Sequence, residues 1–260
     1  MSDISGYSSE VKTASFRGLS GSVLKMIAMA AMLTDHISVV FFGPDMTVLR
    51  LIGRMAFPIF AYLIGEGVRY SKDIKKYALR LFIFALISEI PYDMAFSGSF
   101  FSFEKQNVYF TLLAGLISVV ILRKLKEHKL GFLGIFTTAL VAVVPLVIAS
   151  DYGFMGVVII TLFYVFGGNA GFIRAGGFLL CCAASCFAIV LISPDMIGLD
   201  MIPFSIPIPG IVSSQIYSIL AVIPLMLYNG EKGFKMNRYF FYAFYPVHIL
   251  ILGIIGMFIL

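Results

Sequence analysis

Residues 23–42 read VLKMIAMAAMLTDHISVVFF. A helix of about 20 apolar residues crosses the roughly 30 Å hydrocarbon layer of a bilayer, so this run is long enough to span a membrane. Its second half contains two ionisable residues, Asp35 and His36. A charged side chain in the middle of a membrane helix costs about 2.5–3.5 kcal/mol on insertion scales, and such residues usually serve a function. The pair therefore indicates a polar site inside a membrane protein.

The composition of the whole chain also indicates an integral membrane protein. Of its 260 residues, 60% are hydrophobic and 13% are charged, whereas a soluble domain has about 25% charged residues. We predict a polar cytoplasmic tail over residues 1–22 and a single transmembrane domain over residues 23–260. The tail lacks the basic-then-apolar order of a signal peptide, so we expect the first span to be retained.

Apolar runs recur along the chain and predict an all-α, polytopic transmembrane helix bundle of about nine spans, within a range of about eight to ten. The predicted spans are Val23–Phe42, Thr47–Val68, Lys76–Phe96, Val108–Leu122, Leu130–Ala149, Tyr152–Phe166, Ile173–Ile192, Gly210–Tyr228 and Tyr239–Leu260. The apolar segment Met201–Pro209 contains three prolines, which exclude a regular helix. We expect it to be a re-entrant or surface-lying loop.

Basic residues gather in every second connection between these spans. The tail and the alternate loops hold 14 of them, whereas the remaining loops hold only Lys105. The positive-inside rule then places the N-terminus in the cytoplasm and the C-terminus outside. This placement accounts for the net charge of +5, so we expect a lipid bilayer and no nucleic acid as a partner.

With this orientation, the polar residues inside the spans fall at one depth, in the outer half of the membrane. Arg50 and Arg54 share one helix face, as do Glu89 and Asp93. Pro91 is expected to kink the third span, and Pro246 to free a backbone carbonyl near His248. The predicted site residues at this depth are Asp35, His36, Arg50, Arg54, Glu89, Asp93, Asn107, Gln215, Tyr245 and His248.

Two interpretations of these residues remain open. In one, Arg54 forms a buried ion network with Glu89 or Asp93 that fixes the order of the helices. In the other, His36 acts as a base, because histidine titrates near neutrality, with Asp35 as its orienting carboxylate. Adjacent residues differ by about 100° around a helix, and this difference equally allows an arrangement in which Asp35 faces Arg54. Arg54 or Asn107 would then donate to a developing oxyanion.

A second set of cations is predicted at the cytoplasmic side. Lys25 lies eleven residues before His36, which is about 16 Å along the same helix face. The predicted contacts for the phosphates of a nucleotide-bearing donor are Lys25, Arg69, Lys72, Lys75, Lys76 and Arg80. Membrane topology and anionic lipid binding explain the same cluster equally well.

The three cysteines, Cys181, Cys182 and Cys186, lie in one apolar run. They lack the spacing of a metal-binding pair and have no histidine nearby, so we expect packing residues and no metal site.

Several motifs in order along the chain resemble the TraX family. They are LKMIA and MLTDH at 24–28 and 32–36, GRMAFPIF at 53–60, ISEIPYD at 87–93, NVYFT at 107–111 and YPVH at 245–248. TraX-type proteins are bacterial inner-membrane proteins tied to N-terminal acetylation of pilin. The spacing of Lys25 and His36 also resembles the signature of a wider group of membrane acyltransferases.

The resemblance implies an acetyltransferase in the bacterial cytoplasmic membrane. It implies acetyl-CoA as the cytoplasmic donor, His36 as the catalytic base, and a peptide amine or glycan hydroxyl as the acceptor at the outer side. A proton-coupled transporter or flippase would use the same buried charges as a relay. A non-catalytic assembly factor would use them only to order its helices.

Overall fold

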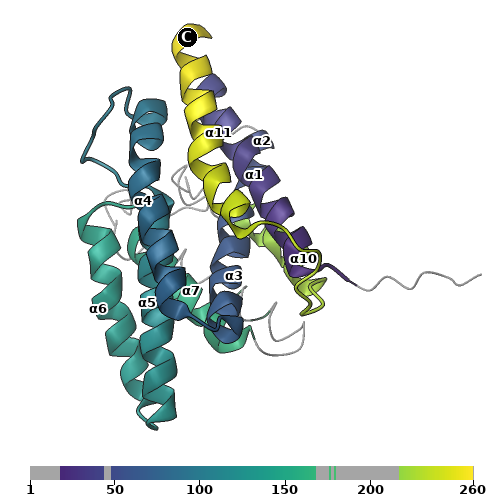
Figure 1. Ribbon diagram of the computed structural model, residues 1–260, viewed down its shortest axis with the longest axis vertical. Helices are drawn as coiled ribbons and strands as arrows, with labels where there is room; N and C mark the ends of the chain where they lie inside the picture. Colours follow the sequence, from purple (N-terminus) through teal and green to yellow (C-terminus); the bar gives the residue numbers. More distant parts are fainter. Residues whose placement is uncertain (1–17, 44–47, 168–175, 177–178, 180–216, 260) are drawn as a thin grey trace, which may run out of the picture.

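The computed structural model describes residues 18–43, 48–167, 176, 179 and 217–259. Over these residues the chain forms a bundle of helices, shown in Figure 1. The elements are α1 (Gly21–Phe42), α2 (Val48–Gly53), α3 (Ala56–Tyr70), α4 (Ile74–Phe96), α5 (Val108–Glu127), η1 (Gly131–Leu133), α6 (Gly134–Val147), α7 (Gly153–Phe166), η3 (Tyr217–Ala221), α10 (Val222–Met226) and α11 (Arg238–Ile259).

Within the described part of the chain, four helical stretches are long and apolar enough to cross a membrane. They are Gly21–Phe42, Val48–Tyr70, Val108–Glu127 and Arg238–Phe258. The helix α4 is as long as these but carries more charge, and α6 and α7 are shorter apolar helices. The all-helical, multi-pass membrane protein predicted from hydropathy is thus confirmed.

Most of the predicted spans correspond to helices. The first, third to sixth and ninth spans match α1, α4, α5, α6, α7 and α11, with ends that differ by a few residues. Nearly all of the seventh span with its cysteines, the segment Met201–Pro209, Gln215 and the tail up to residue 17 lie outside the described residues. The described part of the eighth span is η3 followed by the short α10.

The second predicted span is interrupted at Arg54 and Met55, between α2 and α3. Pro58 explains the break, because it has no N–H to donate to the carbonyl of Arg54 four residues earlier. The N–H of Arg54 still donates to the carbonyl of Arg50 at 3.1 Å. Arg54 therefore keeps its place on the last turn of α2, where it shares a face with Arg50.

Contacts between the helices show their relative directions. α1 and α11 run parallel, since Ser22 contacts Lys232 at one end and Val40 lies next to Gly256 at the other. α4 and α5 run antiparallel, and the hydroxyls of Ser118, Thr138 and Thr161 join α5 to α6 and α7. In Figure 1, α1 and α11 lie side by side, while α5 and α6 form the opposite edge. These directions agree with the alternation of the basic loops.

Candidate functional site

Asp35 of α1 lies between two guanidinium groups from α2. Its Oδ1 atom is 3.4 Å from Nη2 of Arg54 and 3.7 Å from Nη1 of Arg50. Gly53 makes this approach possible, because a Cβ built on it would lie 2.8 Å from the Cα of Asp35. Of the two arrangements that the sequence left open for Asp35, the structure therefore shows the ion pair with arginine. The hydrogen-bond partner of the His36 ring is a different residue.

That residue is His248 of α11. Nδ1 of His36 lies 2.7 Å from Nε2 of His248, and the two rings stack with centroids 4.9 Å apart. Nδ1 of His248 in turn lies 2.6 Å from the carbonyl oxygen of Phe244. His248 is 6% exposed, whereas His36 is only partly buried.

These contacts assign the tautomers of both rings when they are neutral. A carbonyl oxygen can only accept a hydrogen bond, so Nδ1 of His248 carries the proton and its Nε2 is an acceptor. Nδ1–H of His36 then donates to Nε2 of His248. This leaves Nε2 of His36 with a lone pair, which is the form that a general base requires.

Aromatic rings enclose the histidine pair. The ring of Phe96 lies 5.5 Å from that of His36, and the ring of Tyr245 lies 5.9 Å from it. Tyr245 is 3% exposed, and its hydroxyl lies next to the backbone N–H of Val108. Its O–H has no acceptor among the described residues, so it can still donate to a substrate group.

Pro246 explains how α11 is held against α5. It removes the N–H that would bond the carbonyl of Tyr242, and the hydroxyl of Tyr109 donates to that carbonyl at 2.8 Å instead. The prediction that Pro246 frees a carbonyl near the site is thus confirmed, and the freed group fixes α11 next to His248.

Asn107 joins α4 to α5 and uses all of its polar atoms to do so. Its Oδ1 accepts from the N–H of Tyr109 at 3.0 Å as the N-cap of α5. Its Nδ2 donates to the carbonyl of Ala85 at 2.8 Å and to Oε1 of Glu89, and its backbone N–H donates to the same oxygen at 3.0 Å. Asn107 is therefore a structural link in this structure, and its Nδ2 is already engaged, so its predicted role as an oxyanion donor stays a prediction.

Glu89 and Asp93 are likewise not the partners of Arg54, so that predicted ion network is wrong. Glu89 binds Asn107, and Oδ2 of Asp93 accepts from the N–H of Ser102 at 2.8 Å. Asp93 is 2% exposed. Both carboxylates lie at the predicted end of α4. The rotation of α4 about its axis, however, turns them toward α5 and the connection before it.

Asp151 is a partly buried acid that our interpretation of the sequence missed. It lies in the short connection between α6 and α7, and its Oδ1 accepts from the hydroxyl of Tyr92 at 3.0 Å. Burial raises the pKa of Asp151 to about 6, against the lowering effects of the Tyr92 hydrogen bond and the charges of Lys105 and Arg54. In the sequence, Asp151 is a single acid between two apolar runs, at the end of the bundle where α1 ends. This position could have indicated its importance.

The predicted donor-binding cations have different environments. Arg69 is already engaged, since it pairs with Glu66 at 2.8 Å and donates to the carbonyl of Tyr164. Lys25 lies 4.9 Å over the ring of Phe241, and Arg80 lies 5.9 Å from the ring of Tyr242.

Lys72, Lys75 and Lys76 are exposed at the start of α4. Lys76 pairs with Asp73 at 3.2 Å, and this contact, led by the hydrogen bond from the Lys76 backbone, holds the pKa of Asp73 below its usual range.

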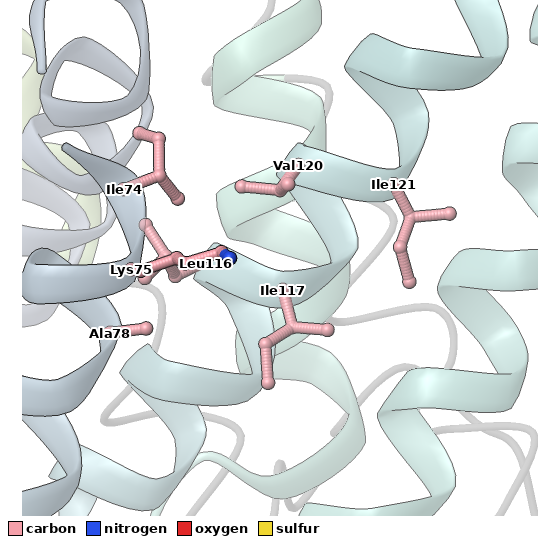
Figure 2. Close-up of a pocket in the computed structure, with 7 residues that line it drawn as sticks. All are labelled: Ile74, Lys75, Ala78, Leu116, Ile117, Val120 and Ile121. Atoms are coloured by element: carbon pink, nitrogen blue, oxygen red, sulfur yellow. The ribbon is translucent and has the colours of Figure 1, made fainter. Parts of the chain in front are cut away.

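Lys75 borders an apolar groove between α4 and α5. Figure 2 shows Ile74, Lys75 and Ala78 on one side and Leu116, Ile117 and Val120 on the other, around a volume of about 190 Å³. Lys75 precedes Glu89 by 14 residues on α4, which is about 21 Å along the axis. The groove is therefore at the opposite end of α4 from the polar residues around His36, and it is separate from them.

Comparison with known proteins identifies the chain's relatives. Residues 20–256 match the family model described as TraX protein. The probable fimbrial assembly protein FimC, serogroup H1, of Dichelobacter nodosus is 29% identical over 255 residues, which cover 91% of this chain and 95% of that protein. An uncharacterized protein of Rickettsia prowazekii (strain Madrid E) is 35% identical over 68 residues, or 26% of this chain and 25% of that protein. No solved structure matches. Since the family model covers nearly the entire sequence, the chain belongs to the TraX family.

Proposed function

We propose that this protein is a membrane-embedded acetyltransferase that moves an acetyl group from cytoplasmic acetyl-CoA to an amine or hydroxyl at the outer side. The observation that carries the proposal is the His36–His248 pair, which leaves Nε2 of His36 as a base, while the adjacent residue Asp35 binds two arginines. The proposal includes about nine spans, a cytoplasmic N-terminus and a place in the bacterial inner membrane, as the basic loops favour.

The chemistry follows from the partners of each side chain. Nε2 of His36 takes the proton of the acceptor N–H or O–H as the acceptor attacks the thioester carbonyl. The resulting oxyanion is stabilised by the guanidinium of Arg54, whose Nε is buried and has no hydrogen-bond partner within the described residues. When the intermediate collapses, the carbon–sulfur bond breaks, and the departing thiolate takes the proton from His36.

Asp35 and His248 support these two groups. Asp35 holds Arg54 and Arg50 in place through its ion pairs. His248 accepts a hydrogen bond from Nδ1–H of His36 and stabilises the imidazolium that forms on His36. The hydroxyl of Tyr245 is available to bind the acceptor or the thioester carbonyl.

The donor is proposed to enter from the end where α1 and α4 begin. Lys25, Lys72, Lys75, Lys76 and Arg80 are the proposed contacts for its phosphates, while Arg69 serves the packing of α3 against α7. A relative named as a fimbrial assembly protein favours a pilin-like peptide terminus as the acceptor. A surface glycan hydroxyl is the alternative acceptor.

The test uses the full chain in lipid nanodiscs with acetyl-CoA as donor. The acceptors offered are a peptide with a free amino terminus and an oligosaccharide, and the readouts are free thiol and acetylated product. His36→Ala should lower turnover about 100-fold or more, because general base catalysis contributes about 10²–10⁴-fold, while acetyl-CoA binding persists. His128→Ala is the matched control, because His128 is exposed in the α5–α6 connection, and it should leave turnover unchanged.

Folded wild-type protein that neither binds acetyl-CoA nor releases thiol would overturn the proposal. The transporter alternative rests on the buried Asp93 and the partly buried Asp151, which are further ionisable groups for a proton relay. It predicts a proton flux across vesicles of the same protein without any consumption of acetyl-CoA.

A further inference from the structure

Three phenylalanines are exposed in the connection between α4 and α5. In this segment, residues 97–106, called here the aromatic loop, the exposed fractions are 65% for Phe100, 71% for Phe101 and 92% for Phe103. A cluster of large apolar side chains on a surface marks a place of interaction. The aromatic loop is therefore a candidate binding surface.

Hydrogen bonds fix the backbone of the aromatic loop. The N–H of Ser102 donates to buried Asp93 at 2.8 Å. At the far end of the loop, the N–H of Gln106 donates to the carbonyl of Ala149 at 3.3 Å, and the N–H of Asp151 donates to the carbonyl of Gln106 at 2.9 Å. The phenylalanines are thus presented by a backbone that is tied to α4 and to the α6–α7 connection.

The helix faces next to the aromatic loop are apolar and are not covered by the described part of the chain. On α4 they form a stripe at intervals of three and four residues, made of Leu79, Phe82, Ile83, Leu86, Ile87 and Ile90. On α6 the exposed residues nearest to the loop are Val143, Val144, Leu146 and Val147. In a membrane protein such faces contact lipid. The aromatic loop adjoins this apolar surface at the end of α4.

The direction of the loop agrees with this arrangement. In Figure 1 it projects sideways from the end of α4, on the side away from α11, and not along the helix axes. A sideways projection lies along the membrane plane. Its charged residues, Glu104 and Lys105, follow the phenylalanines, as in segments that lie at a membrane–water interface.

We propose that the aromatic loop inserts Phe100, Phe101 and Phe103 into the membrane leaflet at this end of the bundle, with lipid as its partner. Lipid is favoured over a protein because the loop adjoins the exposed apolar faces of α4 and α6, which are of the kind that lipid covers in a membrane protein. The anchor also holds the Ser102 N–H against Asp93, so it positions one carboxylate beside the proposed site. The proposal does not depend on acetyl transfer.

The chain contains no tryptophan, so one introduced tryptophan reports its own surroundings. Phe101→Trp is reconstituted in phosphatidylcholine vesicles with and without bromine on the acyl chains. Its fluorescence should fall at least about twofold in the brominated lipid, while aqueous iodide should leave it nearly unchanged. Phe100→Trp and Phe103→Trp repeat the measurement on the other two side chains.

Two variants calibrate the measurement. Leu86→Trp, on the exposed stripe of α4, is the lipid reference, and His128→Trp, in the basic α5–α6 connection, is the water reference. Quenching of all three loop positions by iodide and not by bromine would overturn the proposal and favour a partner in water. Absence of quenching by either agent would also overturn it, because it would place the rings against protein.

Discussion

Two polar regions lie at the same end of the bundle, and they differ in how much hydrogen-bonding capacity remains. In the link between α4 and α5, each polar atom of the Asn107 side chain is used. Between α1, α2 and α11, Nε2 of His36 and Nε of Arg54 have no hydrogen-bond partner among the described residues, whereas on α4 beside the Asn107 link such an atom is the acceptor Oδ1 of Asp93. Buried polar groups that are fully satisfied build structure, whereas unsatisfied ones are costly and are kept where a ligand binds. The comparison separates a structural polar region from a reactive one.

The largest expected effect comes from the residue that orients His36. His248→Phe keeps an apolar ring in the same place but removes the acceptor for Nδ1–H of His36, so the neutral base can adopt the wrong tautomer. We expect acetyl-CoA turnover to fall about 100-fold, within the range for general base catalysis, with little change in unfolding.

His248→Gln supplies the control for this prediction, because its side-chain oxygen can accept the same proton. It should recover part of the lost turnover, and its pH–rate profile should resemble that of the wild type. Equal turnover in His248→Phe and wild type would mean that the histidine pair is structural, like the Asn107 link.

The same comparison shows what a sequence can predict about such a protein. Hydropathy sets which segments become helices, because each backbone group in a membrane must be paired within its own helix. Depth was predictable too, since each residue adds a fixed rise along its helix. Rotation was not, and it decides that Asp35 meets Arg54 while Glu89 meets Asn107.

Asp151 was missed for a different reason. Candidate site residues were sought inside the apolar runs, and Asp151 lies in the short connection between two of these runs. Its importance arises from contacts with α4 that only the folded chain makes. An acid at the end of the bundle where other ionisable residues gather is a signal that can be used in relatives.

The second expected effect is the pH dependence of stability that Asp151 causes. Since burial raises the pKa of Asp151 to about 6, the folded protein holds a proton that the unfolded chain releases above about pH 4. The stability from this group is therefore present at low pH and is lost as the pH rises through about 6.

Asp151→Asn, which resembles the protonated acid, should match the wild type near pH 4. Near pH 7.5 it should be more stable than the wild type by up to about 3 kcal/mol, from two pKa units at about 1.4 kcal/mol each. The measurement is unfolding in mixed SDS micelles at both pH values. A difference between the two proteins that stays constant with pH would show that folding does not change the pKa of Asp151.

The smallest expected effect is the loss of stability when the link between α4 and α5 is removed. Asn107→Ala removes the N-cap of α5 and the bonds that join it to α4, and should cost about 2 kcal/mol of stability. Asn237→Ala is the matched control, because Asn237 caps α11 through Tyr239 at 2.9 Å but is exposed; it should cost about 1 kcal/mol.

Turnover per folded molecule separates the two roles that Asn107 could have. If Asn107 is structural, as its complete set of partners indicates, turnover should be unchanged in Asn107→Ala once it is corrected for the folded fraction. A fall of 100-fold in the folded variant would show that Asn107 leaves its partners when substrate binds. In that event the distinction between satisfied and unsatisfied polar groups would not hold for the substrate-bound protein, because the two regions would then act as one site.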